Sequence, residues 1–454
     1  MNVTELTGSD LVSAYATGEL SPVEVTQATL KRIAEIDGEL NAYCLVDEDQ
    51  AIQQAKSSEE RWQRGEPHGP FDGVPTHLKD IFLTKGWPTL RGSKASDPDQ
   101  EWLEDAPVSH TQRESGMVFL GKTTTPEIAW KAVTDSPLTG ITRNPSDTSL
   151  TPGGSSGGTS AAVAAGMGPV AVGTDAGGSI RIPASFCGIV GLKPTLAQVP
   201  MYPASPFAPL AHAGPMTKTV KDAAILMDII AVPDSRDPNA LPAPRGKYRD
   251  ALHKGITELS IAYSPDLGYV NVDPEVAEIC DRAVKKMMDA GARVTEKDPG
   301  FSDPLDAFEI MWAAGASALL RAMKATPEIL DPGLAKVWEY GETLSGVDYI
   351  ESRTIGANLG ILMGEFHKQH DLLITPTVAI PPFEAGRDVP ADSDMERWPQ
   401  WASFSIPFNM TGQPAISVPV GKTAAGLPVG LQIVGPRHRD DLVLAAGQLV
   451  ESLT

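Results

Sequence analysis

One stretch, Thr151–Ser179, constrains the fold of this chain more than any other. It reads TPGGSSGGTSAAVAAGMGPVAVGTDAGGS: a glycine and serine loop, an alanine-rich run, a short apolar run and a second glycine turn. Glycine adopts backbone conformations closed to other residues and lets the backbone approach a ligand closely. We therefore expect a helix over 159–165, a strand over 170–172, and two loops that bring Ser155 and Ser179 into one site.

A lysine ends a short apolar segment further upstream, Gly73–Phe82. The residues before Lys79 are strand-like, which predicts that its side chain is partly buried; a solvated surface lysine is the alternative. Burial disfavours the ammonium form of lysine and can make the amine a usable base. The chain thus offers candidate nucleophilic hydroxyls and a candidate base.

These residues and their surroundings resemble the amidase signature family, whose catalytic triad is Ser-cisSer-Lys. The matching motif runs GGSSGGTSAAVAAG…VGTDAGGSIRIPASFCGIVGLKPT. The resemblance covers about 73–216 and returns at Asn409–Gly435. It implies an α/β/α sandwich with one large mixed, twisted β-sheet covered by helices, and the alternation of helix-like and strand-like segments also favours this class. We predict a single domain over 1–454 with a variable, mostly helical region at about 300–370.

The resemblance also implies a role for each residue of the motif. Ser179 is the nucleophile, Ser155 relays its proton from a cis peptide after Gly154, and Lys79 is the base. The oxyanion hole is formed by the backbone N–H groups of Ala176, Gly177, Gly178 and Ser179. Three further residues are auxiliary, bonding to the catalytic network or holding the glycine turn: Ser156, Asp175 and Arg181.

Several other patterns in the sequence leave alternatives open. Residues 153–157 also match G-x-S-x-G, the nucleophile elbow of α/β-hydrolases, which predicts an esterase using Ser155 and a downstream histidine. Ser179 could instead cap the helical segment that follows it. Cys187 is interpreted as a small buried hydrophobe. His367-x-x-His370 could form half of a metal site, but no adjacent glutamate makes the pattern HExxH, so we predict no metal and no cofactor.

The charge balance narrows the range of partners. With 37 basic and 58 acidic residues the formal net charge is −21, which argues against nucleic acid and anionic membrane surfaces as partners. Three scattered cysteines are too few for a disulfide framework. The N-terminus has neither the basic region nor the apolar core that a secretory signal peptide would show. We expect a cytoplasmic monomer or homodimer.

Two features of the sequence bear on the substrate: the residues at the glutamine-binding positions of a related subunit, and the residues of the predicted pocket. The glutaminase subunit of the tRNA-dependent amidotransferase has this signature and holds glutamine with an arginine and an aspartate. Counting along this chain places Gly356 and Ala402 at those positions, with Arg353 three residues away. The pocket is instead predicted to be apolar or aromatic, lined by Trp130, Tyr202 and Phe207.

We therefore predict a serine amidohydrolase that cleaves small apolar or aryl amides through an acyl-enzyme. Aryl carbamates are also possible substrates, as for an aryl acylamidase or urethanase. The first alternative is the glutaminase subunit, whose activity depends on a tRNA-binding partner. A catalytically silent binding protein and the α/β-hydrolase-type esterase are the others.

Overall fold

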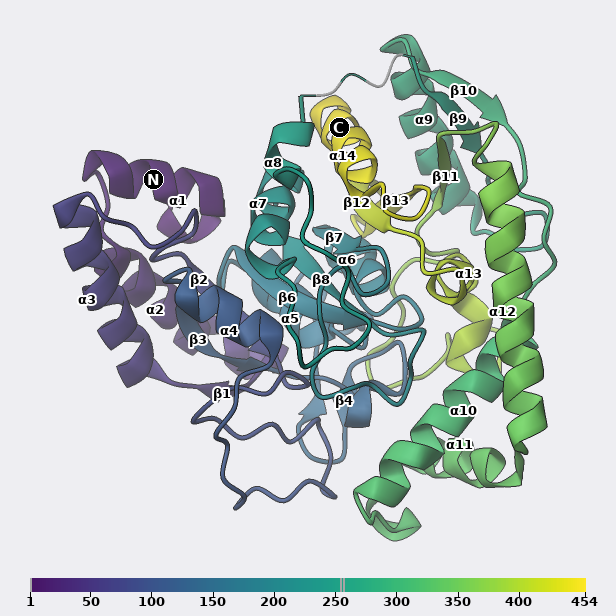
Figure 1. The fold of residues 1–454 in the computed structure, drawn as a ribbon, viewed down its shortest axis with the longest axis horizontal. Coiled ribbons are helices and arrows are strands. Elements are labelled where there is room, and N and C mark those ends of the chain that lie inside the picture. The colour runs from purple at the N-terminus through teal and green to yellow at the C-terminus, as the bar shows by residue number, and fades with distance from the viewer. Residues whose placement is uncertain (1, 254, 256–257) are drawn as a thin grey trace.

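A mixed sheet of 11 strands runs through the molecule (Figure 1). The structure is a computed structural model that describes residues 2–253, 255 and 258–454. Neighbouring strands follow the order β1-β3-β2-β6-β8-β7-β12-β13-β11-β9-β10. The strands of this sheet are β1 (Tyr43–Val46), β2 (Pro75–Lys79), β3 (Val118–Thr123), β6 (Val170–Asp175), β7 (Val190–Lys193), β8 (His212–Thr217), β9 (Ser260–Tyr263), β10 (Arg293–Glu296), β11 (Leu372–Pro376), β12 (Ala415–Lys422) and β13 (Pro428–Val434). A separate ribbon pairs β4 (Asp135–Ser136) with β5 (Gly140–Ile141).

Parallel and antiparallel pairs are mixed across the sheet. β2 is parallel to both β3 and β6, and β9 is parallel to both β10 and β11. The pairs between these two parallel groups are antiparallel, from β6–β8 through β7–β12 to β11–β13. Parallel neighbours need long crossover connections, which helices supply. The predicted mixed α/β sheet is confirmed.

Helices cover the sheet and extend beyond it. They are α1 (Gly8–Thr17), α2 (Pro22–Leu40), α3 (Glu48–Arg64), α4 (Pro107–Glu114), α5 (Gly157–Ala164), α6 (Arg181–Cys187), α7 (Val220–Ile230), α8 (Tyr248–Ala251), α9 (Pro274–Asp289), α10 (Leu305–Ala322), α11 (Pro332–Thr343), α12 (Gly346–Phe366), α13 (Ile406–Met410) and α14 (Asp440–Leu453). None of the described helices combines the length and the apolar composition that a transmembrane segment requires.

Both faces of the sheet are buried, as in a three-layer sandwich. α7, α9 and α14 pack on one face, and α5 and α6 pack on the other. Side chains of β6 alternate between the two layers: Val170 and Val172 join the core under α7, whereas Ala171 meets Ala184 of α6. A strand buried on both faces has no polar alternation, which is why 170–172 is a continuous apolar run.

The N-terminal helices follow their capping signals. Ser21 and Glu24 form a reciprocal capping box at α2, with Pro22 at the first helical position. At α1 the N-cap is Thr7, which forms a reciprocal capping box with Asp10. The Ser9 hydroxyl donates to Asp222 Oδ1 at 2.5 Å and ties α1 to α7.

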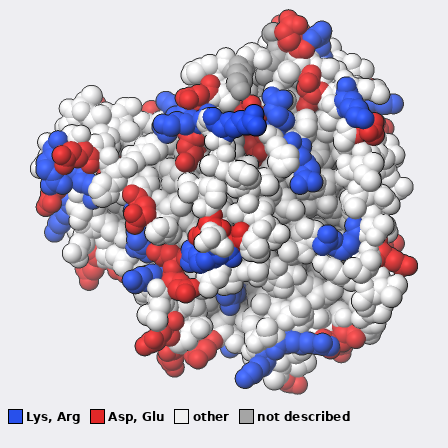
Figure 2. Space-filling model, in the orientation of Figure 1, with Lys and Arg blue, Asp and Glu red and all other residues white. Residues whose placement is uncertain are grey.

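The predicted helical region at 300–370 consists of α10, α11 and α12, which lie together along one side of the molecule (Figure 1). α10 packs against both of the others, and α12 packs on α13. Within this helical group, α10 brings Trp312 and Leu319 to the cavity that Ser155 and Ser179 line. Figure 2 shows acidic and basic side chains interspersed over one face of the molecule with broad neutral areas between them.

Candidate active site

Lys79 is the last residue of β2 and lies between β3 and β6, where it is fully buried. Its Nζ is 2.6 Å from Ser155 Oγ and 2.8 Å from Thr174 Oγ1. Burial lowers the pKa of Lys79 well below its usual value, and the Asp175 carboxylate opposes this shift only in part. A neutral amine in this position can accept the Ser155 proton.

The loop before α5 is shaped by close packing against residues 133–134. The Gly154–Ser155 peptide is cis. A Cβ on Gly154 would lie 2.5 Å from the Val133 carbonyl oxygen, and one on Gly157 would lie 2.3 Å from Thr134 Oγ1. These glycines are therefore required for the loop to fit, and the fit sets the position of the Ser155 hydroxyl.

Ser156 connects the two serine loops to β6. Its backbone N–H donates to the Ser179 carbonyl oxygen at 3.1 Å. Its hydroxyl donates to the Thr174 carbonyl at 3.1 Å and accepts the Thr174 N–H at 3.3 Å. Ser156 therefore holds the strand that carries Thr174, one of the two hydroxyl partners of Lys79.

Asp175 and Arg181 brace the turn that carries Ser179, and both side chains are fully buried. The carboxylate of Asp175 accepts the N–H groups of Gly178 at 2.8 Å and Ile180 at 3.1 Å. It also receives two bonds of 3.0 Å from the Arg181 guanidinium. Burial raises the pKa of Asp175, but the charge and hydrogen bonds of Arg181, together with the Lys193 charge and the Asn409 hydrogen bond, outweigh burial, and the pKa lies below its ordinary value.

The remaining Arg181 donors reach across the sheet. The guanidinium bonds to Gln432 Oε1 at 2.7 Å, to Asn409 Oδ1 at 2.6 Å and to the Ser405 carbonyl at 3.2 Å. Asn409 in turn donates to Asp175 Oδ1 at 2.9 Å. This explains why the sequence motif that contains Asn409 accompanies the glycine-rich core although it lies far downstream in the chain.

One of the four backbone amides predicted to form the oxyanion hole differs from the other three in its hydrogen bonding. Within the described residues, no acceptor bonds to the backbone N–H of Ala176, Gly177 or Ser179. The N–H of Gly178 is different because it donates to Asp175. The Gly178 amide is therefore already engaged in shaping the turn, whereas the other three amides are available for the predicted role of binding an oxyanion.

Ser155 and Ser179 line one cavity of about 160 Å³. Its walls come from segments far apart in the chain: Ile81, Arg91, Ile128, Ala129, Thr174, Ala176, Met201, Pro203, Ala204, Ser205, Pro206, Phe207, Ala211, Trp312 and Leu319. Phe207 lies in this wall as predicted, and its ring packs on that of Trp312 with centroids 4.5 Å apart. The cavity is apolar apart from hydroxyls and one guanidinium.

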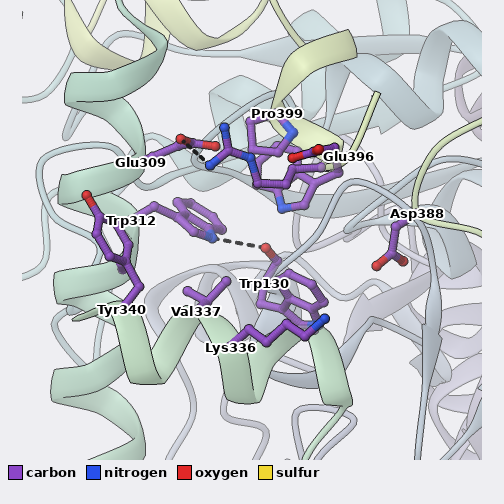
Figure 3. Close-up of a pocket in the computed structure, with 13 residues that line it drawn as sticks. Trp130, Glu309, Trp312, Lys336, Val337, Tyr340, Asp388, Glu396 and Pro399 are labelled. Atoms are coloured by element: carbon purple, nitrogen blue, oxygen red, sulfur yellow. Dashed lines mark hydrogen bonds and ion pairs between the residues drawn. The ribbon is translucent and has the colours of Figure 1, made fainter. Parts of the chain in front are cut away.

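The other two predicted pocket residues do not line this cavity. The prediction for Tyr202 is wrong, because its ring turns away from the cavity and lies under the Arg236 guanidinium, which is 4.6 Å from the ring centroid. The prediction for Trp130 is wrong, because Trp130 lines a neighbouring cavity of about 350 Å³. Trp312 belongs to the walls of both cavities. Figure 3 shows that second cavity, where Trp312 Nε1 donates to the Trp130 carbonyl at 3.0 Å.

The other sequence candidates lie outside the catalytic cavity. Cys187 is buried, and burial raises the pKa of its thiol to about 12. His367 bonds to the His370 carbonyl and to Gln413, and the described residues contain no group of three or more potential metal ligands. Arg353 lines a cavity beside the catalytic one. Gly356 packs near Met410, where a Cβ would find the methyl group of that side chain at 3.4 Å.

Three contributors to the site were missed in the sequence. Thr174 is a hydroxyl partner of Lys79, and its place inside the glycine turn was the available signal. Arg91 and Trp312 line the cavity. No local pattern marks either of them, because only the tertiary fold brings their segments to the serines.

The site combines a buried lysine that bonds to one serine with a second serine in the same cavity. This combination of base and nucleophile is typical of hydrolases that form an acyl-enzyme. The Amidase family matches residues 24–444, and the chain belongs to this family of amidase signature enzymes. It is similar to an acylamidase of Rhodococcus erythropolis, at 36% identity over 100% of this chain and 96% of that protein.

Other relatives extend the comparison. A glutamyl-tRNA(Gln) amidotransferase subunit of Thermobifida fusca (strain YX) is 35% identical over 99% of this chain and 95% of its own length. The crystal structure of a bacterial aryl acylamidase of the amidase signature family superposes with a TM-score of 0.92 and 30% identity, covering 99% of this chain and 96% of that one. The chain is thus an amidase that acts on small-molecule amides.

Proposed function

We propose that this amidase is a serine amidohydrolase in which Ser179 is the nucleophile, Ser155 the proton relay and Lys79 the base. The observation that carries the proposal is the 2.6 Å contact between Lys79 Nζ and Ser155 Oγ in the cavity that Ser179 shares. Without a histidine among the described residues of that cavity, the lysine is the available base. This favours the triad over an α/β-hydrolase mechanism with Ser155 as nucleophile.

The chemistry then proceeds in two halves. Ser179 Oγ attacks the amide carbon while its proton passes to Ser155, whose own proton passes to Lys79. The N–H groups of Ala176, Gly177 and Ser179 stabilise the negative oxygen that forms. When the C–N bond breaks, the leaving amine takes a proton back along the same route. Water then attacks the acyl-enzyme, and the acid is released with Ser179 restored.

The cavity walls favour apolar or aryl amides. Phe207 and Trp312 present aromatic surface beside the serines, and most of the other lining residues are aliphatic. The names of the relatives, acylamidase and aryl acylamidase, agree with substrates of this kind. Aryl carbamates and esters offer the same carbonyl geometry, and we extend the proposal to them. A cytoplasmic location and a monomeric or homodimeric state stay predictions from the sequence.

The glutaminase component of an amidotransferase is the second candidate, because relatives from that enzyme are nearly as similar as the acylamidase. Against it, the positions expected to hold glutamine carry Gly356 and Ala402, and Arg353 does not line the catalytic cavity. Ammonia release from glutamine by the purified chain, with and without a tRNA-binding partner, separates the two functions. We expect none in either case.

The direct test is release of para-nitroaniline from para-nitroacetanilide by the purified chain. Ser179→Ala is expected to lower kcat by about 10⁴-fold or more. Ser205→Ala is the matched control, since Ser205 lines the same cavity but bonds to no member of the triad. Equal losses in the two variants, or no loss in Ser179→Ala, would contradict the assignment.

A further inference from the structure

Arg91 is the charged residue in the described wall of the catalytic cavity, which it shares with Ser155 and Ser179. The other lining residues carry apolar groups or hydroxyls. A half-buried guanidinium in such surroundings is unusual, because charged side chains that leave water are normally paired. Neither the fold nor the proton relay described above uses this charge.

No partner for the guanidinium is found among the residues that the structure describes. Within the described part of the chain, no carboxylate lies within ion-pair distance of Arg91, and none of its side-chain nitrogens makes a hydrogen bond. Burial lowers the pKa of Arg91, and the Asp80 carboxylate acts against this shift from a distance. Asp80 is itself engaged, with Lys122 Nζ at 3.0 Å and the Leu90 N–H at 3.3 Å. The positive charge at the cavity is therefore left for another anion.

The backbone holds Arg91 in a fixed place. Its carbonyl accepts the N–H of Ile128, another cavity residue, at 2.7 Å. Its φ of 56° lies in the left-handed region, which residues other than glycine seldom adopt. Gly92 follows with a φ of 61°, and a Cβ there would lie 2.5 Å from the Thr125 carbonyl oxygen. A segment constrained in this way presents a donor group at a defined position instead of a mobile surface charge.

We propose that Arg91 determines specificity by binding a carboxylate of the substrate. The guanidinium offers planar, paired N–H donors whose spacing matches a carboxylate, and such bonds are stronger than neutral ones. The preferred substrates are thus small apolar or aryl amides that also carry a carboxylate near the scissile bond. This inference rests on the proposed function, because it names the substrate class of the same cavity.

The test compares matched chromogenic amides. Para-nitroacetanilide is neutral, the succinyl monoamide of para-nitroaniline carries a carboxylate on the acyl side, and the acetyl amide of a carboxyl-bearing nitroaniline carries it on the amine side. We expect the parent to prefer at least one charged amide, mainly through a lower KM. Arg91→Met should lower kcat/KM for that amide on the order of ten- to hundredfold while changing the neutral amide by less than about threefold.

Two further variants make the result specific. Arg91→Lys keeps the charge without the planar fork and should retain an intermediate preference. Arg353→Met removes an exposed arginine from the adjoining cavity and should leave the preference unchanged. Equal losses for neutral and charged amides in Arg91→Met would overturn the inference, since they would indicate a role in holding the loop or in stacking on the substrate ring. Loss of the preference in Arg353→Met would overturn it as well.

The Arg91 proposal can still be tested by binding if the proposed function is wrong. If the parent hydrolyses none of the three amides, binding of the two charged amides to Ser179→Ala is measured by calorimetry, with and without the added change Arg91→Met. Binding of at least one of them that weakens tenfold or more without Arg91 supports the carboxylate site. Binding that does not depend on Arg91, or no binding of either, overturns it.

Discussion

The side chains of Lys79 and Ser155 meet at 2.6 Å although 76 residues separate them in the chain. β2 and β6 are adjacent parallel strands, so Lys79 and Thr174 both reach the carboxyl ends of their strands on the same edge of the sheet. Ligand sites in open α/β sheets form at such edges. The proposed proton relay would thus depend on strand pairing as much as on the serine motif.

Lys79 should control the pH dependence of hydrolysis. Its pKa is lowered well below the usual 10.5, and the proposed mechanism needs the neutral amine, so kcat/KM should rise with pH through the lowered pKa and reach a plateau before the pH at which an ordinary lysine titrates. Lys79→Met should lower kcat by about 10²- to 10⁴-fold and abolish this rise. A steady-state pH profile measures both. A profile that still climbs at pH 10 would mean that the lysine is an ordinary ammonium.

Thr174 should tune the lysine without being essential. Thr174→Val removes the 2.8 Å contact with Lys79 Nζ but leaves the Ser155 contact in place. We expect kcat to fall by about tenfold, since one hydrogen bond contributes on the order of 1 kcal/mol. Ser155→Ala should cost much more, because it interrupts the relay. Similar losses in the two variants, in the same kinetic assay, would contradict this ordering.

The Asp175–Arg181 pair should support stability at neutral pH and lose that support in acid. The pKa of Asp175 is lower in the folded chain than the ~3.9 of an unfolded aspartate, so its contribution is complete above about pH 5 and declines as the pH falls further. Arg181→Met should lower the free energy of unfolding by about 3–5 kcal/mol at pH 7, because it leaves a buried carboxylate unpaired.

Urea unfolding from pH 7 to pH 3 tests the stability of this pair. Asp234, which pairs with Arg236 on a more exposed part of the surface, provides the control Asp234→Asn. That control should change stability by no more than about 1 kcal/mol. If Arg181→Met unfolds like the control, the buried pair is not needed to hold the turn.

Much of this architecture was predictable from the sequence. The serine motif and Lys79 identified the sheet class, because their spacing and glycine content fit one family pattern. Gly154 is needed because a Cβ there would lie 2.5 Å from the Val133 carbonyl oxygen, and the glycine density of its loop indicated such a close approach in advance. Local caps were less certain: Thr7 and Ser9 are both suitable caps, and only the packing of α1 on α7 decides between them.

The cavity wall was not predictable in the same way. Phe207 and Tyr202 lie five residues apart in one Pro-rich loop, yet one faces the serines and the other faces Arg236. Irregular loops have no periodicity that says which side chains point inward. Trp312 lies on α10, whose association with the serine loops depends on the whole fold. Trp130 lines the neighbouring cavity, which shares Trp312 with the cavity that contains the serines.

Trp312 should act as a partition that limits substrate size. Trp312→Ala would join the cavities of about 160 Å³ and 350 Å³, so amides with naphthyl groups should gain about tenfold in kcat/KM relative to nitroanilides. The same change should lower stability by about 3–5 kcal/mol. Trp338→Ala is the control because Trp338 lines neither cavity. An unchanged ratio of the two rates in Trp312→Ala would show that the cavities do not communicate.

The identity of the nucleophile is the central claim, and an acyl-enzyme trapped in acid during turnover tests it most directly. Intact-mass analysis of the quenched enzyme should find one added acyl group, fragmentation of the peptide 144–181 should place it on Ser179 and not on Ser155, and none should be found in Ser179→Ala. An acyl group on Ser155 would contradict the account and favour the α/β-hydrolase-type alternative. Turnover by Ser179→Ala at the parental rate, with no acyl group on any residue, would contradict covalent catalysis altogether.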